Sequence, residues 1–235
     1  MRFVFSRARH RGATLVEFVI VFPLGVLFML GLIQAGLIYM AKLQLNNATF
    51  MAARAGSLNN ASEGTIREAV IRGLIPFYQS ADDTNDFMRI LKANIKAHTG
   101  TLLPGRLNVE VLNPSQAAFD DFGIEDPDKG VIYIPNDNLE WRSGKGSSSN
   151  LELRDANLLK LKVVYGYELK VPLMAGVLKR MMCGGKIGVE AWGNVDFADA
   201  IAPGSTDCLL YYRQDRIPIE SFAIVEMQSR AEKPN

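Results

Sequence analysis

Histidine and cysteine are scarce in this 235-residue sequence, which contains two of each. Beyond the N-terminal region the only histidine is His98, at the end of a helical pattern, where a surface role is the usual one. One histidine and two cysteines cannot supply the ligands of the common zinc sites. No serine lies in a nucleophile-elbow context, and neither Gly144-Lys145 nor the CGGK segment at 183–186 has the upstream glycine of a phosphate loop. The sequence nominates no catalytic residue, metal ligand or cofactor, and we expect a protein that is not an enzyme.

An excess of charge of one sign is also missing. The chain has 26 basic and 25 acidic residues, a net charge of +1. The first twelve residues contain no acid but four arginines, Arg2, Arg7, Arg9 and Arg11, so the rest of the chain carries a net charge of −3. A mildly acidic body gives no electrostatic reason to bind nucleic acid, and we expect no nucleic-acid partner.

A long apolar run from Ala13 to Ala41 contains a single formal charge, Glu17. A membrane-spanning helix needs about 20 predominantly apolar residues, so this run is sufficient. The arginines before it predict, by the positive-inside rule, a cytoplasmic N-terminus and a translocated remainder. We therefore expect a single-pass protein of the bacterial inner membrane with a periplasmic C-terminal domain. A cleaved secretory signal is the alternative, but its apolar region would be only about 7–15 residues long.

Three features of the apolar run allow two readings each. Pro23 either bends the helix or is a tolerated membrane proline. Gly31 and Ala35 form a small-xxx-small pair that would let helices pack closely, although such pairs also arise by chance. Gln34 either forms a hydrogen bond across helices or lies near the outer headgroups.

The helical pattern continues beyond the bilayer. We expect a helical extension over residues 42–57, ended by Gly56, because apolar residues recur at spacings of four and three: Leu37, Ala41, Leu45, Ala48, Ala52 and Ala55. The domain boundaries that follow are a basic leader at 1–12, a transmembrane helix at 13–41, the extension at 42–57 and a periplasmic α+β domain at 58–235.

The domain pattern begins with two amphipathic helices. In the first, which Ser62 is placed to cap, the apolar face is Ile66, Ala69, Val70, Gly73, Leu74 and Phe77. In the second, with Asp83 or Thr84 near its start, the apolar face is Phe87, Ile90, Leu91 and Ile95.

Period-two patterns then predict strands at 107–111, 158–171 and 187–197, with a short helix at 173–182 whose Met174, Val177, Leu178 and Met181 point inward. Residues 143–150 are expected to form a flexible loop, and the tail after Met227 is expected to fray. The fold class is α+β with a mainly antiparallel sheet.

Cys183 and Cys208 both lie beyond the membrane span. In an oxidising compartment a disulfide between them is expected, and two buried free thiols are the alternative. Outside the cell, the acidic stretch Asp120, Asp121, Glu125, Asp126 and Asp128 either binds calcium or forms a solvated loop. It does not fit the spacing of the twelve-residue calcium loop.

The segment RGATLVEF, residues 11–18, combines a basic leader, a glycine, an immediate apolar helix and one acid. An ionisable group at the centre of a bilayer helix costs about 2.5–3.5 kcal/mol, and less near the interface, so we expect Glu17 to have a partner. Cleavage between Gly12 and Ala13 would create a cationic amine at the positive end of the helix dipole. Ala13 and Glu17 are four residues apart on one helix face. Glu17 is therefore placed to neutralise its own amine or that of an adjacent subunit.

This arrangement resembles the class III signal sequences of type IV pilins. More narrowly, RGATLVEFVIVFPLGVLFMLGLIQAG followed by AARAG at 52–56 resembles the TadE-like family of pseudopilins from the Flp, or tight-adherence, pilus system. A looser likeness runs through LLKLKVVYGYELKVPL at 158–173. The resemblance implies Gly12 as the residue before the cleavage, Ala13 as the mature N-terminus, Glu17 as the acid needed for processing or packing, and Phe18 as the aromatic beside it. Because position 13 is Ala and not Phe, N-methylation is not implied.

The resemblance implies a pilin-like periplasmic domain and the function of a minor pseudopilin in pilus assembly and adhesion. The implied partners are a prepilin peptidase, other minor pseudopilins, the major Flp pilin, the inner-membrane assembly platform and membrane lipid. An uncleaved signal-anchor protein with a periplasmic binding or scaffold domain is the alternative. A tethered hydrolase would need a pocket with a nucleophile and convergent acids, which the sequence does not nominate.

Overall fold

The computed structural model describes residues 13–79, 85–142, 144–183, 208 and 210–233, with side chains from Val16 onward. Its elements are α1 Ala13–Leu58, α2 Glu63–Leu74, η1 Ile75–Tyr78, α3 Asp86–Thr101, β1 Leu107–Asn113, α4 Gln116–Phe122, β2 Ile124–Glu125, β3 Ile132–Ile134, α5 Leu153–Ala156, β4 Leu158–Glu168, α6 Met174–Met182, η3 Tyr212–Gln214, β5 Arg216–Glu226 and β6 Ala231–Glu232. The strands of both sheets pair antiparallel. The α+β fold class is confirmed; the expected strand at 187–197 lies outside the described residues.

Helix α1 is the longest element, with 46 residues and a length of about 69 Å at 1.5 Å per residue. It continues through Pro23 and does not end at Gly56. Gly56 is instead a packing position, because a Cβ there would lie 2.6 Å from Cγ1 of Ile66. The helix ends at Leu58 and the chain turns through Asn60 and Ala61, which have left-handed φ angles of 56° and 57°.

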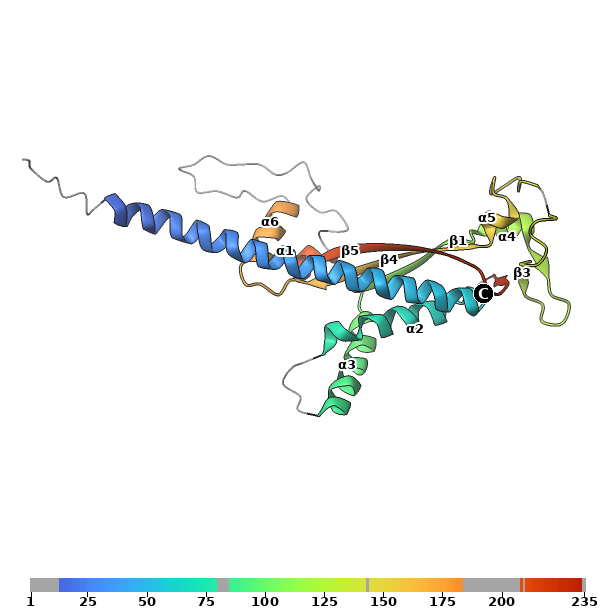
Figure 1. Cartoon of the computed structure of the whole chain (residues 1–235), viewed down its shortest axis with the longest axis horizontal. Coiled ribbons are helices and arrows are strands. Elements are labelled where there is room, and N and C mark those ends of the chain that lie inside the picture. Colours follow the sequence, from blue (N-terminus) through green and yellow to red (C-terminus); the bar gives the residue numbers. More distant parts are fainter. Residues whose placement is uncertain (1–12, 80–84, 143, 184–207, 209, 234–235) are drawn as a thin grey trace, which may run out of the picture.

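The main sheet has the strand order β1-β4-β5, with β4 at its centre. The period-two pattern predicted this strand, but β4 ends at Glu168, three residues before the expected end. Past Glu168 the backbone changes partners, since the amide of Leu169 donates to the carbonyl of Asp215 and the amide of Val171 donates to the side chain of Gln34. In Figure 1 the strands run alongside the second half of α1.

The hydrophobic core lies between this sheet and the two helices α1 and α2. From α1 it receives most of the predicted seam, and its largest fully buried apolar side chains are Leu45, Ile66, Val70, Leu74, Ile134, Leu159, Leu161 and Val163. Small residues bring α2 against α1, because a Cβ on Gly73 would lie 2.5 Å from the Cβ of Ala48. In η1, which follows α2, the ring of Phe77 stacks on Tyr165 with 5.7 Å between the ring centroids. The domain is therefore built directly on α1.

Helix α3 differs from its sequence pattern in the face that it buries. It packs through the small residues Ala93, Ala97 and Thr101, while its large apolar residues are at least 41% exposed: Phe87, Met88, Ile90, Leu91 and Ile95. Small side chains allow the close approach to η1 and α2, and Figure 1 shows α3 projecting from that side. The caps also differ: Ser62 forms no side-chain cap, whereas Asn85 accepts hydrogen bonds from the amides of Phe87 and Met88.

The C-terminal tail, expected to fray, is ordered as far as Lys233 and fastens the end of α1. The amides of Gln228 and Ser229 both donate to the carbonyl of Ser57, and β6 pairs with β3 in the small sheet β2-β3-β6. Arg230 forms an ion pair with Asp126 at 2.6 Å. Hydrogen bonds between the tail and Ser57 join positions far apart in the sequence, so the local pattern of the tail carries no signal of them.

The loop expected to be flexible at 143–150 is held by one carboxylate. Asp121 accepts hydrogen bonds from the amides of Ser148 and Ser149 and from the hydroxyls of Ser147 and Ser149. The bonds from Ser149 are the main reason that the pKa of Asp121 lies well below its usual range. The serines that suggested flexibility therefore bind a side chain from α4, and the described part of this loop is anchored.

The contact between Gly73 and Ala48 gives the first prediction. Gly73→Ala should destabilise the domain by about 1–3 kcal/mol, because the added methyl group forces α2 away from α1. Gly64→Ala, in the same helix but with its nearest neighbour at 3.9 Å, is the matched control and should be neutral or stabilising. Denaturant unfolding of the full chain in detergent micelles measures both. Equal stability of the two variants would contradict this account of the α1–α2 contact.

Candidate functional site

The N-terminal part of α1 carries an apolar surface that the domain does not cover. Its most apolar 18-residue window has a mean hydropathy of 2.5, and none of that window is buried. The residues from Val16 to Met29 are all exposed. A soluble protein rarely exposes so large a contiguous apolar surface, whereas a lipid bilayer covers it without cost.

Glu17 interrupts this apolar surface near its start. Its side chain is exposed on α1, beside Phe18, which is 62% exposed and stacks on Phe22 with 5.1 Å between ring centroids. Ala13 is the first residue of α1 and lies one helical turn before Glu17. Gly12, the predicted residue before the cleavage, lies outside the described residues.

Among the described side chains of α1, the first buried one is Gln34. This side chain is 2% exposed, and its Oε1 accepts a hydrogen bond from the backbone amide of Val171 at 2.9 Å. The sequence allowed Gln34 either a hydrogen bond to a second membrane helix or a place near the headgroups. In the structure it accepts a hydrogen bond from the folded domain of its own chain. One turn earlier, a Cβ on Gly31 would lie 3.9 Å from Sδ of Met174, so the Gly31–Ala35 pair borders α6. Gln34 marks the point where α1 passes from an exposed helix to a helix of the core.

Beyond Gln34, α1 keeps one apolar face free while the opposite face is buried in the core. The exposed members are Tyr39, Met40, Leu43, Phe50 and Met51, each at least 50% exposed. This free face follows on from the uncovered surface at the N-terminus. Both surfaces belong to one helix, so a neighbouring helix has a continuous apolar path along α1.

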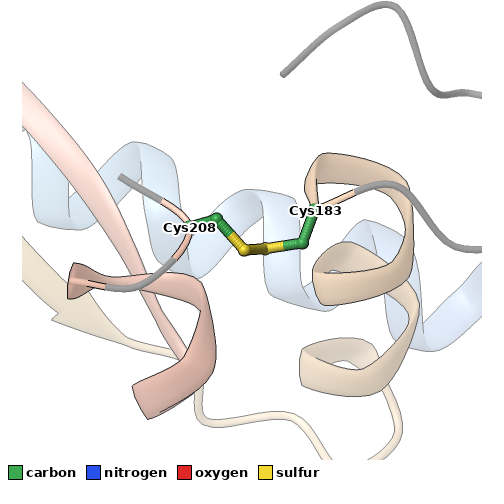
Figure 2. Close-up of a disulfide and its surroundings, with 2 residues drawn as sticks. All are labelled: Cys183 and Cys208. Carbon is green, nitrogen blue, oxygen red and sulfur yellow. A yellow bond between two sulfur atoms is a disulfide. The ribbon is translucent and has the colours of Figure 1, made fainter. Parts of the chain in front are cut away.

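A disulfide joins Cys183, directly after α6, to Cys208, which precedes η3, as Figure 2 shows. The Cα atoms are 5.5 Å apart and the cysteines are separated by 25 positions in sequence. Closing a loop of this length restricts the unfolded chain and stabilises the fold by roughly 3 kcal/mol in the chain-entropy model. The bond ties α6 to the strand-bearing part of the domain.

The acidic stretch is engaged internally at three of its members, of which Asp120 accepts a hydrogen bond from the side chain of Gln116. Asp121 holds the serine loop, and Asp126 accepts from the amide of Asp128 and pairs with Arg230, which together lower the pKa of Asp126. Elsewhere, His98 lies 3.5 Å from Glu68. Within the described part of the chain, no three His, Cys, Asp or Glu residues are grouped closely enough to hold a metal ion. The site that stands out is therefore the anchoring helix and not a pocket with reactive groups.

Residues 12–54 match the family model described as TadE-like protein. No curated protein and no solved structure matches the chain. The match begins at Gly12, one residue before α1 begins, and covers Glu17, Phe18, Gln34 and most of the free face of α1. It supports membership of the chain in the TadE-like family, and together with the exposed apolar surface of α1 it fits a membrane-anchored, single-pass protein related to the Tad pilus.

Proposed function

We propose that this chain is a TadE-like minor pseudopilin that a prepilin peptidase cleaves after Gly12 and that then takes part in assembling an Flp-type pilus. The observation that carries the proposal is the family match, which begins at residue 12 and includes Glu17 on α1. Glu17 lies one helical turn after Ala13, the residue that would become the N-terminus. Cleavage there would leave the α-amino group of Ala13 at the first residue of the anchoring helix.

Glu17 provides the charge partner for that amine. An unpaired carboxylate on the lipid-facing surface of α1 is costly, and the new ammonium group has the opposite charge. Within one subunit the two groups are separated by one helical turn. Between subunits, the same pairing would favour one stagger of two α1 helices, because any other stagger loses the ion pair between them. We assign Glu17 this role in assembly.

The free face of α1 is the surface on which subunits would meet. Tyr39, Leu43 and Phe50 extend the apolar surface of the membrane segment along the domain. The partners on this surface are other minor pseudopilins and the major Flp pilin, delivered by the inner-membrane assembly platform. The orientation that this requires has Arg2–Arg11 in the cytoplasm and the domain in the periplasm. The proposal gives the chain no catalytic role.

An uncleaved signal-anchor protein with a ligand-binding domain is the second candidate. The observation in its favour is a cavity of about 550 Å³ between α4 and the serine loop, lined in part by Arg142 and Lys145. It lies at the end of the domain opposite the uncovered part of α1, where Figure 1 shows α4 and α5. The state of the N-terminus distinguishes the two candidates.

Processing after Gly12 predicts the mass of the native protein. Chain isolated from its own host should begin at Ala13 and lack the mass of residues 1–12, and in cells without the prepilin peptidase it should keep them. Gly12→Val should block the cut in peptidase-containing cells. Intact-mass spectrometry measures all three. A native chain that retains the leader in the presence of the peptidase supports the signal anchor and rules out the pseudopilin.

The assembly role of Glu17 predicts a separate defect. Glu17→Gln should insert into the membrane but reduce the number of pili about tenfold, equivalent to a loss of about 1.4 kcal/mol in one assembly contact. Val21→Gln, one turn further along the same face, is the matched control because it adds an amide and keeps the carboxylate. Pilus counts by electron microscopy are compared with the mature mass of each variant, which separates assembly from processing. Unchanged piliation in Glu17→Gln would eliminate the charge-pair mechanism.

A further inference from the structure

Helix α6 lies across α1 at the level where α1 enters the domain, as Figure 1 shows. Its apolar side chains share one face, at spacings of three and four: Met174, Val177, Leu178 and Met181. On the other side of the same helix, Lys179 and Arg180 are exposed. A short helix with an apolar face and a basic face has the composition of a segment that lies in a membrane interface.

The apolar face of α6 and the surface of α1 enclose a groove of about 360 Å³. Its walls on α1 include Leu27, Phe28 and Leu32, and its walls on α6 are the four apolar residues of that helix. Among the described residues that line the groove, Gln34 is the polar one. The volume is in the range of small-molecule pockets, about 300–1,000 Å³. An apolar molecule therefore suits this groove better than a polar one.

The depth of the groove follows from the length of α1. From Ala13 to Gln34 the helix rises about 32 Å at 1.5 Å per residue. The hydrocarbon core of a bilayer is about 30 Å thick, so Gln34 lies near the boundary on the domain's side. Leu27 and Phe28, which wall the groove, are then surrounded by acyl chains. Lys179 and Arg180, on the opposite face of α6, lie at the level of the phosphates.

We propose that α6 is a second membrane contact and that the groove between α6 and α1 takes an acyl chain of a phospholipid from the leaflet on the domain's side. Lys179 and Arg180 are the complementary charges for the lipid phosphate. The disulfide at Cys183 fixes the end of α6 to the domain, and the Gln34–Val171 hydrogen bond fixes the segment before α6 to α1. Together they hold the domain at one depth on the membrane.

The continuity of the surface favours lipid over a second copy of the chain. The walls contributed by Leu27 and Phe28 belong to the exposed apolar segment that lipid covers in an unassembled subunit. An acyl chain enters from that side without any change in the protein.

Quenching of tryptophan fluorescence by lipids brominated on their acyl chains tests this contact in the full chain. The two native tryptophans are removed by Trp141→Phe and Trp192→Phe, and the chain is reconstituted into vesicles of phosphatidylcholine and phosphatidylglycerol. Leu178→Trp and, as a second position, Met181→Trp should lose at least half of their emission in brominated vesicles. The native Trp141, which is 86% exposed in the domain and is kept as the single tryptophan in a Trp192→Phe variant, is the control outside the membrane and should lose much less.

The inference rests on the membrane anchoring of α1, so Phe22→Trp serves as a probe of insertion. Quenching of Phe22→Trp without quenching at 178 and 181 would overturn the α6 contact and leave the anchor intact. No quenching at Phe22→Trp would show that the anchoring itself fails. Emission of Leu178→Trp could instead be protected at a high protein-to-lipid ratio and quenched only when more lipid is added. That result would assign the groove to a second copy of the chain and overturn the proposal that an acyl chain occupies it.

Discussion

One constraint governs this molecule: a single unbroken helix has to be stable in two solvents. Through its first part α1 has apolar residues exposed on every side, which suits lipid. Through its second part it buries one stripe in a folded core and exposes the other. The change occurs at Gln34, whose side chain satisfies the amide of Val171 where the chain leaves β4. The side-chain oxygen of Gln34 therefore has a backbone partner in the domain at the point where α1 becomes buried.

The buried stripe explains how the domain adheres to the helix. Ala41, Ala48 and Ala52 are at most 1% exposed, and Gly73 of α2 meets Ala48 with no room for a methyl group. Small residues bring backbones close together, which increases dispersion contacts over the length of the interface. The same small residues lose little side-chain entropy on packing. A long helix with an alanine seam is therefore well suited to carry a sheet on one side and a second helix beside it.

The features that were readable from the sequence are those with local periodicity. Helix α1, α2 and strand β4 follow from spacings of 3.6 and 2, and the position of Gly12 before an apolar helix that contains Glu17 was sufficient to indicate the TadE-like family. The features that were missed depend on distant partners. The serine loop is held by Asp121 from α4, and the C-terminal tail is held by Ser57 from the end of α1.

Helix α3 shows a different limit of periodicity. Its pattern identified an apolar face correctly, but the core selected the adjacent face, where Ala93 and Ala97 permit closer approach. Periodicity shows that a helix has an apolar face and a polar face, but it does not show which part of the helix surface a neighbouring element covers. For the same reason the pattern predicts a helix end at Gly56, whereas Gly56 lies within α1 and its lack of a side chain leaves room for Ile66. A hydrophobic pattern does not show whether a small residue ends a helix or allows a neighbouring element to pack closely against it.

The placement of the domain has a consequence for how such subunits can associate. Sheet and α2 occupy the core side of α1, and α6 borders it at the membrane boundary, so the side with Tyr39, Leu43 and Phe50 is the one left for a neighbour. That side is continuous with the lipid-exposed surface that contains Glu17. A neighbouring helix can therefore exchange lipid for protein contacts along the whole of α1 without any rearrangement of the core. In the assembly that we propose, such an exchange conserves apolar burial, so the stagger between helices would be specified by the few polar groups on α1, above all by Glu17.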